Sequence, residues 1–270
     1  MGLGKNNEQE QWAIFLAAIC GQTYAQFANL EGLFIVPSDY WVTNTIQAKS
    51  ITHVWERFGF ILESPQEIII AFRGTSSRPN WISNINASQR KFQYIKEDCL
   101  THRGFTDIYS STRDEIISTV TTLSADKTLY ITGHSLGAAL ATLCAVDIAA
   151  NTPHISPNLI TYGSPRVGDP AFSKAISKYV QNSQRFANIF DLVTYAPPSV
   201  YKLPKREKRY YYRHVQTLSS LSFQNGSVGI NHMIGSYFAD LSKLQPEFTE
   251  QLCVTNPGFC PVIITTESLE

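Results

Sequence analysis

The sequence predicts an α/β protein with a largely parallel central sheet flanked by helices. Apolar segments of strand length alternate with segments of helical periodicity along most of the chain. A glycine-bounded turn, Gly133–Gly137, joins one of these strands directly to an alanine-rich helix. The 270 residues are enough for one such domain, and no linker or internal repeat divides them. We therefore expect residues 1–270 to form a single α/β domain.

The first half of the chain predicts a helix, two strands and a second helix. Trp12–Cys20 is an apolar run that indicates an amphipathic first helix. Val54–Leu62 and Glu67–Arg73 have the composition of strands, and the serine and proline within Glu63–Gln66 favour a turn between them. In Phe105–Leu123 the apolar residues recur at helical spacing.

The second half continues the alternation of strands and helices. Asp169 precedes a proline at the start of one helical segment, which is typical of an N-cap. We expect strands at Lys127–Thr132, Leu159–Tyr162, Phe186–Phe190 and Tyr210–Val215, and helices at Ala138–Ala150, Pro170–Val180 and, last in the chain, Met233–Leu244.

Charge and composition exclude several classes of protein. Lys plus Arg equals Asp plus Glu at 22 each, so nothing indicates nucleic acid as a partner. The apolar run near the N-terminus follows Glu8 and Glu10 and is too short to cross a membrane. It has the wrong flanking charge for a signal peptide, so we expect a cytoplasmic protein, with secretion as the alternative.

The five cysteines match no zinc-binding pattern. Cys20 and Cys144 lie in apolar runs and are interpreted as core residues. Cys253 and Cys260 flank a turn at Asn256–Gly258, so a disulfide is an option there. Five thiols without a disulfide framework nevertheless favour a reducing compartment.

Gly133-His134-Ser135-Leu136-Gly137 carries the chemistry of the chain. It matches the G-x-S-x-G nucleophile elbow of α/β-hydrolases, in which small residues let a strand and a helix meet at a sharp turn. The motif follows an apolar strand and precedes a strong helix former, which is the context that it requires. The alternative is a glycine-rich turn with an incidental serine. We expect Ser135 to be a nucleophile.

A serine nucleophile needs a base and an acid, and in this fold they follow it in the order acid, then histidine. Only His214 and His232 come late enough. His232 precedes the last helix and is favoured, because His214 lies in a predicted strand. Asp191 follows a strand and is favoured as the acid over Asp169, which suits a helix cap. An ordinary turn aspartate is the alternative for Asp191.

The oxyanion of an acyl transfer requires two fixed donors. The backbone N–H of Leu136 suits one, and Thr75, which follows a strand, suits the other. Beyond it Trp81, Ile82 and Ile85 would share one apolar side of a short helix, which is either a lid or a permanently packed element. The region Lys202–Arg213 is rich in Lys and Arg. It could attract an anionic interface, although a solvated hairpin is the simpler interpretation.

These motifs together resemble the class 3 lipase family, the fungal-lipase-like branch of the α/β-hydrolases. The matching stretches are Ala71–Ser77 with Asn80-Trp81, His102–Phe105, Gly133–Ala141 and Tyr162–Asp169. The resemblance implies an α/β-hydrolase fold with a lid over Ser76 to about Ile95. By position it also implies a catalytic triad of Ser135, Asp191 and His232, with Thr75 and Leu136 as oxyanion donors.

The resemblance implies an ester hydrolase, with triacylglycerol lipase as the leading activity. Phospholipase A1 and feruloyl-type esterase use the same residue types and stay open, as does a non-catalytic lipid- or protein-binding module on this fold. The substrate would be a lipid ester, with transient contact to a lipid interface. No metal or organic cofactor is needed for this chemistry, and no transmembrane segment is expected.

Overall fold

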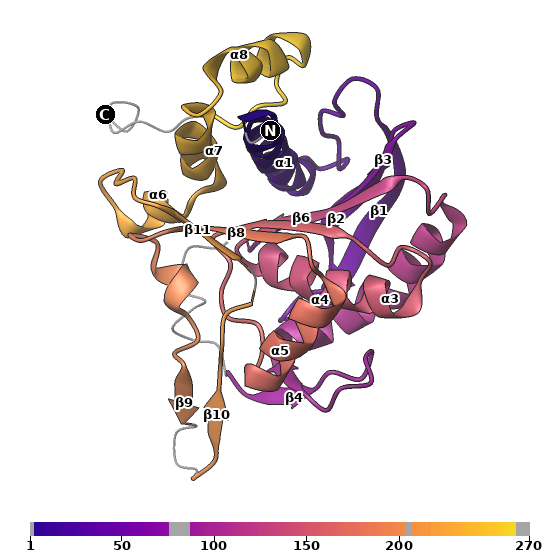
Figure 1. Cartoon of the computed structure of the whole chain (residues 1–270), viewed down its shortest axis with the longest axis vertical. Coiled ribbons are helices and arrows are strands. Elements are labelled where there is room, and N and C mark those ends of the chain that lie inside the picture. The colour runs from indigo at the N-terminus through magenta and orange to yellow at the C-terminus, as the bar shows by residue number, and fades with distance from the viewer. Residues whose placement is uncertain (1–2, 76–86, 203–206, 216, 263–270) are drawn as a thin grey trace.

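A seven-stranded sheet forms the centre of the protein, whose computed structural model describes residues 3–75, 87–202, 207–215 and 217–262 (Figure 1). Its strand order is β1-β2-β3-β6-β7-β8-β11. β1, β2 and β3 pair antiparallel, and the remaining neighbours are parallel. The strands are β1 Trp41–Lys49, β2 Trp55–Glu63, β3 Glu67–Phe72, β6 Thr128–His134, β7 Asn158–Tyr162, β8 Ser183–Asn188 and β11 Thr217–Leu221.

Helices cover both faces of this sheet, so the predicted fold class is confirmed (Figure 1). One face carries α1 Leu3–Ala28, α7 Ile234–Ser242 and α8 Pro246–Thr255, and the other carries α3 Arg103–Thr122, α4 Leu136–Asn151 and α5 Pro170–Tyr179. Shorter elements complete the fold: β4 Gln89–Lys91, β5 Leu100–His102, η1 Leu192–Tyr195, β9 Val200–Lys202, β10 Arg209–Tyr211 and α6 Val228–His232.

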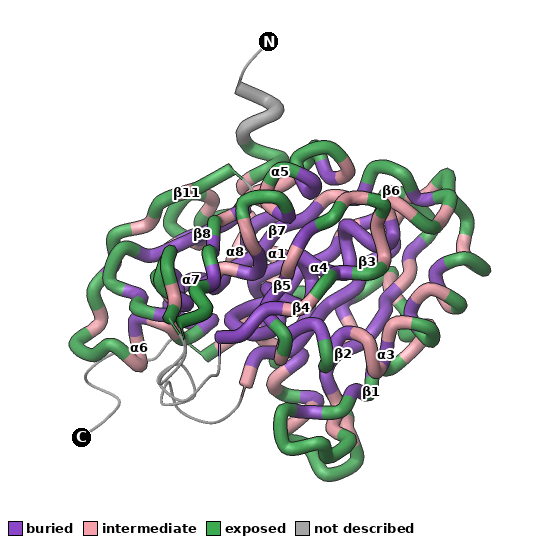
Figure 2. Tube along the Cα trace, turned by 90° about the horizontal axis from the view of Figure 1, so that it is seen from below, coloured by how far each residue is buried: buried purple, intermediate pink, exposed green. Residues whose placement is uncertain are grey.

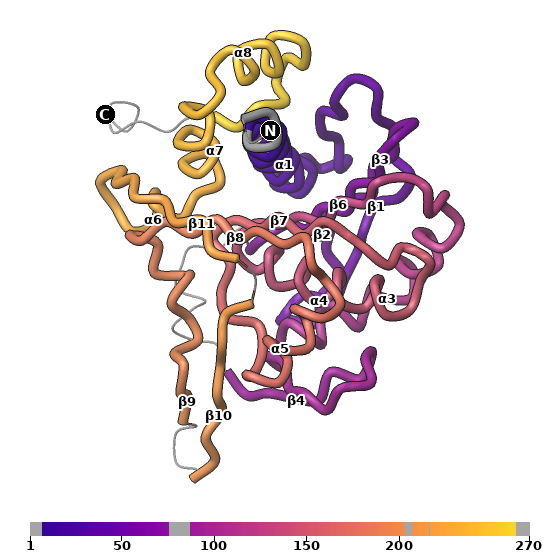
Figure 3. The backbone as a smooth tube through the Cα atoms, viewed as in Figure 1, coloured from indigo at the N-terminus to yellow at the C-terminus, as the bar shows by residue number. Residues whose placement is uncertain are grey.

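Each face of the sheet has its own apolar core. Figure 2 shows the buried residues gathered in the middle of the molecule, with exposed residues along its outer loops. α4 is buried almost throughout, because it packs between the sheet and α3. α1 lies beside α7 and α8, which come from the other end of the chain (Figure 3).

The first helix corrects one expectation. Trp12–Cys20 lies inside α1, and every residue from Leu16 to Cys20 is fully buried. The segment is therefore enclosed nearly all round instead of having one solvent-facing side. The sheet covers one side of α1, while α7 and α8 cover others. A run that is apolar on every side of a helix is typical of such burial, but the sequence could not show that the covering elements α7 and α8 lie more than 200 residues away.

Three further differences concern the C-terminal third and the edge strands of the sheet. Of the expected strand Tyr210–Val215, only Tyr210 and Tyr211 lie in a strand, β10, which pairs with β9 outside the main sheet. Arg213 forms an isolated bridge with Gly168. The expected last helix, Met233–Leu244, is α7, and α8 follows it. The edge strands β1 and β11 were not expected from the sequence. Their largely exposed side chains lack the apolar signal that marks interior strands.

The cysteines divide into two groups. Cys20, Cys99 and Cys144 are free and buried, so the prediction that Cys20 and Cys144 are core residues is confirmed. Cys253 and Cys260 form a disulfide, with their Cα atoms 5.6 Å apart. The disulfide that the sequence left as an option is therefore present, which removes the argument for a reducing compartment from five free thiols. The turn after α8 brings the two sulfur atoms together, and the sequence had given only the turn. Within the described part of the chain, no helix is long and apolar enough to cross a membrane.

Arg185 on β8 offers a test of an unbalanced buried charge. The residue is 6% exposed. Within the described ranges, its Nε atom has no hydrogen-bond partner and its guanidinium forms no ion pair. Leu218 on the edge strand β11 lies directly opposite in the parallel register and is half exposed. Leu218→Glu would place a carboxylate beside the guanidinium. We expect it to stabilise the fold by about 1 kcal/mol and to raise the Tm by about 2–4 °C.

Thermal denaturation at low ionic strength measures this effect. Leu218→Gln is the matched control, because it has the same length without the charge, and it should leave the Tm nearly unchanged. A glutamate variant no more stable than the glutamine variant would show that Arg185 needs no counter-charge.

His102 gives a pH dependence whose sign can be worked out. It is the N-cap of α3, where its Nδ1 accepts a hydrogen bond from the Phe105 N–H at 3.3 Å. Burial lowers its pKa to about 3, so it is neutral in the folded protein. The unfolded chain binds a proton below about pH 6.5. Stability from this residue is therefore complete above that pH and falls as the pH drops, by about 2 kcal/mol at pH 5.

His102→Asn should make the loss of Tm between pH 7 and pH 5 shallower, because asparagine keeps a capping acceptor without titrating. His53→Asn, at an exposed position, is the control and should leave the pH profile of the Tm as it is. Equal slopes for the His102 variant and the parent protein would refute this assignment.

Candidate active site

Ser135 lies at a strained turn between β6 and α4. Its φ of 59° and ψ of −126° are unusual for a residue with a side chain. The flanking glycines are required by close backbone contacts. A Cβ on Gly133 would lie 2.3 Å from the Gly137 oxygen, and a Cβ on Gly137 would lie 2.2 Å from the Phe72 oxygen. The turn therefore presents the Ser135 side chain at the carboxyl edge of the parallel strands.

A chain of hydrogen bonds links the three residues expected to form the triad. The Ser135 hydroxyl lies 2.7 Å from His232 Nε2, and His232 Nδ1 lies 2.8 Å from Asp191 Oδ2. A carboxylate only accepts, so Nδ1 carries the proton and Nε2 is free to accept the serine proton. Asp191 is fully buried, and His232 ends α6. This is the geometry of a nucleophile, a base and an orienting acid.

Asp191 is held by two further donors. It is the N-cap of η1, and its Oδ1 accepts the Val193 N–H at 2.9 Å. The hydroxyl of Tyr237, on α7, donates to Oδ2 at 2.6 Å. Burial and the nearby carboxylate raise the pKa of Tyr237 well above its ordinary value, so it stays a donor. The sequence gave no signal for Tyr237, because this contact depends on how α7 packs on the sheet.

His134 holds the backbone of the base. Burial and the neighbouring His232 lower its pKa well below the ordinary value, so its ring is neutral. Its Nε2–H donates to the His232 carbonyl oxygen at 2.6 Å, and its Nδ1 accepts from the Tyr24 hydroxyl at 2.7 Å. Sequence order left His134 out of the predicted triad and gave no hint of this contact. His134 thereby links α1 to the end of α6, where His232 lies.

The two expected oxyanion donors lie on either side of Ser135. Leu136 is the first residue of α4, so its N–H has no partner within the helix. Gly74 follows β3 and packs against the elbow, since a Cβ on it would lie 2.9 Å from the Cβ of Ser135. Thr75 is the next residue and is half buried. The strand end before Thr75 is thus in contact with the nucleophile turn.

Arg73 anchors this strand end. Its side chain is 1% exposed, and its Nη1 donates to the Gly74 oxygen at 2.7 Å. Its Nη2 pairs with the Glu56 carboxylate at 3.0 Å, and its guanidinium stacks on the ring of Phe27 at 3.8 Å. A buried cation with these partners fixes the backbone in front of Thr75.

His214, the other late histidine, does not reach the serine. It follows β10, and its Nε2 lies 2.7 Å from the Thr194 oxygen. Burial and the nearby Arg185 lower its pKa to about 3. Asp169, the other candidate acid, caps α5 by accepting the Phe172 N–H at 2.8 Å, so its prediction as an N-cap is confirmed.

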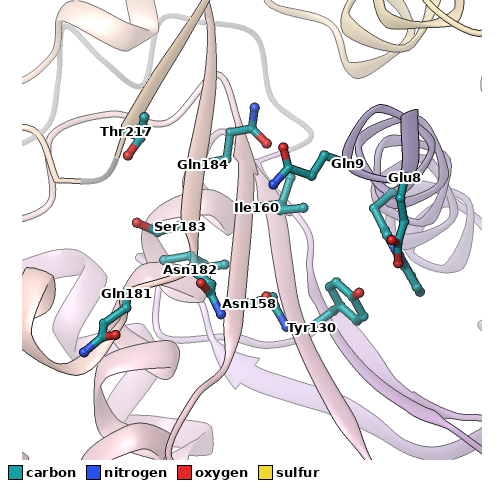
Figure 4. Close-up of a pocket in the computed structure, with 12 residues that line it drawn as sticks. Glu8, Gln9, Tyr130, Asn158, Ile160, Gln181, Asn182, Ser183, Gln184 and Thr217 are labelled. Atoms are coloured by element: carbon teal, nitrogen blue, oxygen red, sulfur yellow. The ribbon is translucent and has the colours of Figure 1, made fainter. Parts of the chain in front are cut away.

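Trp81, Ile82 and Ile85, the apolar residues expected for a lid, lie outside the described residues. A pocket of about 540 Å³ is found elsewhere, beneath α1 (Figure 4). Tyr130, Asn158 and Ser183 line it from the amino ends of their strands, whereas Ser135 follows the carboxyl end of β6. This pocket therefore lies away from the candidate active site. Among the described residues, no group of three or more His, Cys, Asp or Glu could hold a metal ion.

Comparison with known proteins yields one family. Residues 69–201 match the family model described as lipase (class 3). The chain is 34% identical over 145 residues to a lipase of Rhizomucor miehei, a match that covers 52% of this chain and 40% of that protein. It is 31% identical over 139 residues to the secreted mono- and diacylglycerol lipase 1 of Fusarium solani. This match covers 50% of the present chain and 41% of the Fusarium protein.

The chain is thus similar to the class 3 lipase family over residues 69–201. Its structure resembles lipase II from Rhizopus niveus with a TM-score of 0.62 at 26% identity, over 72% of this chain and 76% of that one. The α/β-hydrolase fold expected from the motifs is therefore confirmed. The matched regions span only about two fifths of the length of the curated class 3 relatives. The expected cytoplasmic location finds no support among them, since the Fusarium relative is named as secreted.

Proposed function

We propose that this protein is a class 3 lipase and hence a serine ester hydrolase, with triacylglycerol as its leading substrate. The observation that carries the proposal is the hydrogen-bonded chain from Ser135 through His232 to Asp191 at a strained elbow. A buried serine with a purely structural role requires neither a histidine as hydrogen-bond acceptor nor a positive φ, and Ser135 has both. The similarity to proteins named as lipases supports the choice of lipid ester.

The proposed mechanism is a two-step acyl transfer. His232 takes the Ser135 proton as Oγ attacks the ester carbonyl, while Asp191 stabilises the imidazolium that forms. The N–H groups of Leu136 and Thr75 would donate to the oxyanion. His232 then protonates the leaving alcohol, and water attacks the acyl-enzyme by the reverse proton path. All the groups in this scheme come from the chain itself.

Substrate class is tested by a panel of esters with purified protein. Rates should be highest on emulsified long-chain triacylglycerol and lower on phosphatidylcholine and on methyl ferulate, with Ser135→Ala as the blank. A higher rate on phospholipid or on the feruloyl ester would replace the substrate assignment. No rate above the blank on any ester would favour a non-catalytic binding module.

The lid remains a prediction from the sequence. Of the expected lid range Ser76 to about Ile95, the part from Ala87 onward belongs to the body, since Gln89–Lys91 forms β4 and Phe92 is fully buried. If the remaining part covers the site, the rate on a partly soluble triacylglycerol should rise sharply above its solubility limit. A rate that follows substrate concentration smoothly through that limit would argue against a lid.

We also propose that the protein is secreted. The Cys253–Cys260 disulfide and the relatives named as secreted support this location. Fractionation of the source cells, with thiol alkylation before lysis, tests it. Protein found only inside the cells with reduced Cys253 would contradict it.

A further inference from the structure

The hairpin of β9 and β10 extends away from the body of the molecule (Figures 1 and 3). It begins at Val200, shortly after Asp191 and directly beyond the η1 turn that this carboxylate caps. The hairpin is therefore connected to the candidate active site by one short segment. Nothing in the proposed chemistry of ester cleavage uses its residues.

One face of the hairpin ties it to the body. Tyr201 and Tyr210 pair across the two strands and pack with Ala87 and Tyr212. The Tyr212 hydroxyl donates to the Ala87 oxygen at 2.8 Å, and Gln89 Nε2 donates to the Tyr211 oxygen at 2.7 Å. These contacts hold the hairpin at a defined position beside β4.

The opposite face of the hairpin is exposed and combines apolar and basic side chains. Side chains alternate along a strand, so Val200 and Lys202 share this face, where they lie opposite Tyr211 and Arg209. Val200 is 49% exposed and Tyr211 is 51% exposed. We call these four residues the hairpin face.

The charges of the hairpin face are not balanced internally. Lys202 and Arg209 are direct cross-strand partners, and like charges placed opposite each other are unfavourable. Among the described residues from 200 to 213, Glu207 is the one acidic residue. Its Oε1 atom lies 3.3 Å from the Nζ atom of Lys202, and its side chain is 96% exposed. Such an exposed pair contributes little. An anionic partner would relieve the repulsion.

The neighbouring surface around the triad is apolar. Leu192 and Tyr195, on η1 between Asp191 and the hairpin, are 56% and 52% exposed. Met233, next to His232, is 42% exposed. Tyrosine and aliphatic residues beside lysine and arginine are suited to a lipid–water boundary, where the apolar parts enter the lipid and the cations meet phosphate groups.

We propose that the hairpin face docks on an anionic phospholipid surface and so brings the active site to its substrate. This inference rests on the proposed function and names the partner of that site. The whole chain has a net charge of zero, so attraction to an anionic surface requires a local group of cations, which the hairpin face supplies. Two cations at an anionic surface contribute about 30-fold in binding, at about fivefold for each.

Vesicle co-sedimentation of Ser135→Ala protein tests this inference without lipid turnover. We expect binding to vesicles of phosphatidylcholine with phosphatidylserine to exceed binding to phosphatidylcholine alone, and to weaken as salt is added. Lys202→Ala combined with Arg209→Ala should lower the affinity for the anionic vesicles about 30-fold. Lys49→Ala combined with Lys243→Ala removes the same charge from exposed sites elsewhere and should leave binding unchanged.

Each outcome bears on the inference. Equal binding to both kinds of vesicle would overturn it, as would equal loss in the two double variants. Binding to an acidic polymer such as heparin without binding to vesicles would also overturn it. Hydrolysis of a soluble ester by the Lys202 and Arg209 variant, with native Ser135, should match the parent. A parent without esterase activity that still binds anionic vesicles would refute the proposed function alone.

Discussion

Ser135→Ala is expected to lower kcat on a soluble p-nitrophenyl ester by about a millionfold while the Tm stays within a few degrees of the parent. The hydroxyl makes its hydrogen bond to His232, so its loss removes the nucleophile but little packing. Alanine also keeps the Cβ at the strained φ. Initial rates, thermal denaturation and labelling by a fluorophosphonate measure the effect, and the label should be lost together with the activity.

Ser164→Ala is the matched control for this loss. Ser164 is also buried and lies near the elbow, but its hydroxyl bonds to the Pro165 oxygen and faces no histidine acceptor. The control should keep both labelling and turnover. Turnover retained in Ser135→Ala would remove the basis of the proposed mechanism.

The second large effect separates the two late histidines. His232→Ala should reduce kcat about as much as Ser135→Ala, because the two residues act as a unit. Its Nε2 is the acceptor for the serine proton, whereas His214 Nε2 contacts the Thr194 oxygen. His214→Ala should therefore cost stability through lost packing while most of kcat is kept. Parallel measurement of kcat and Tm for both variants distinguishes the two roles.

The double variant Ser135→Ala with His232→Ala gives a further check. Its kcat should be no lower than that of either single variant, because a base without a nucleophile has no proton to take. Losses that multiply would mean that His232 acts independently of Ser135. An inactive His214→Ala protein with a native Tm, beside an active His232→Ala protein, would exchange their roles.

Local sequence patterns predicted a structural feature correctly wherever its physical cause lies within a few residues of it. The elbow follows from glycines at 133 and 137, since both positions are closed to a Cβ by neighbouring backbone. The cap at Asp169 follows from a carboxylate three residues before the N–H that it accepts. Strands β2, β3, β6 and β7 were predicted within two residues at each end, because interior strands are continuous apolar runs.

Local sequence patterns failed to predict a feature where a segment is covered by, or pairs with, another segment far away in the chain. The edge strands β1 and β11 are largely exposed, so their sequences carry little pattern of their own. Trp12–Cys20 was expected to lie in an amphipathic helix, yet the sheet, α7 and α8 enclose it. The disulfide of Cys253 depends on the path of the chain after α8, which no local pattern specifies.

The sequence by itself predicted the sharp turn that carries Ser135, the proposed nucleophile, since the steric demands of a strand–helix turn are local to five residues. The expected order of nucleophile, acid and histidine along the chain narrowed the choice of base, but it left both His214 and His232 as candidates. Only the tertiary structure decided which imidazole lies at Ser135, because His232 is 97 residues away and the strand order and α6 bring it there. The contacts of Tyr237 and His134 have the same origin, since packing between separate elements creates them.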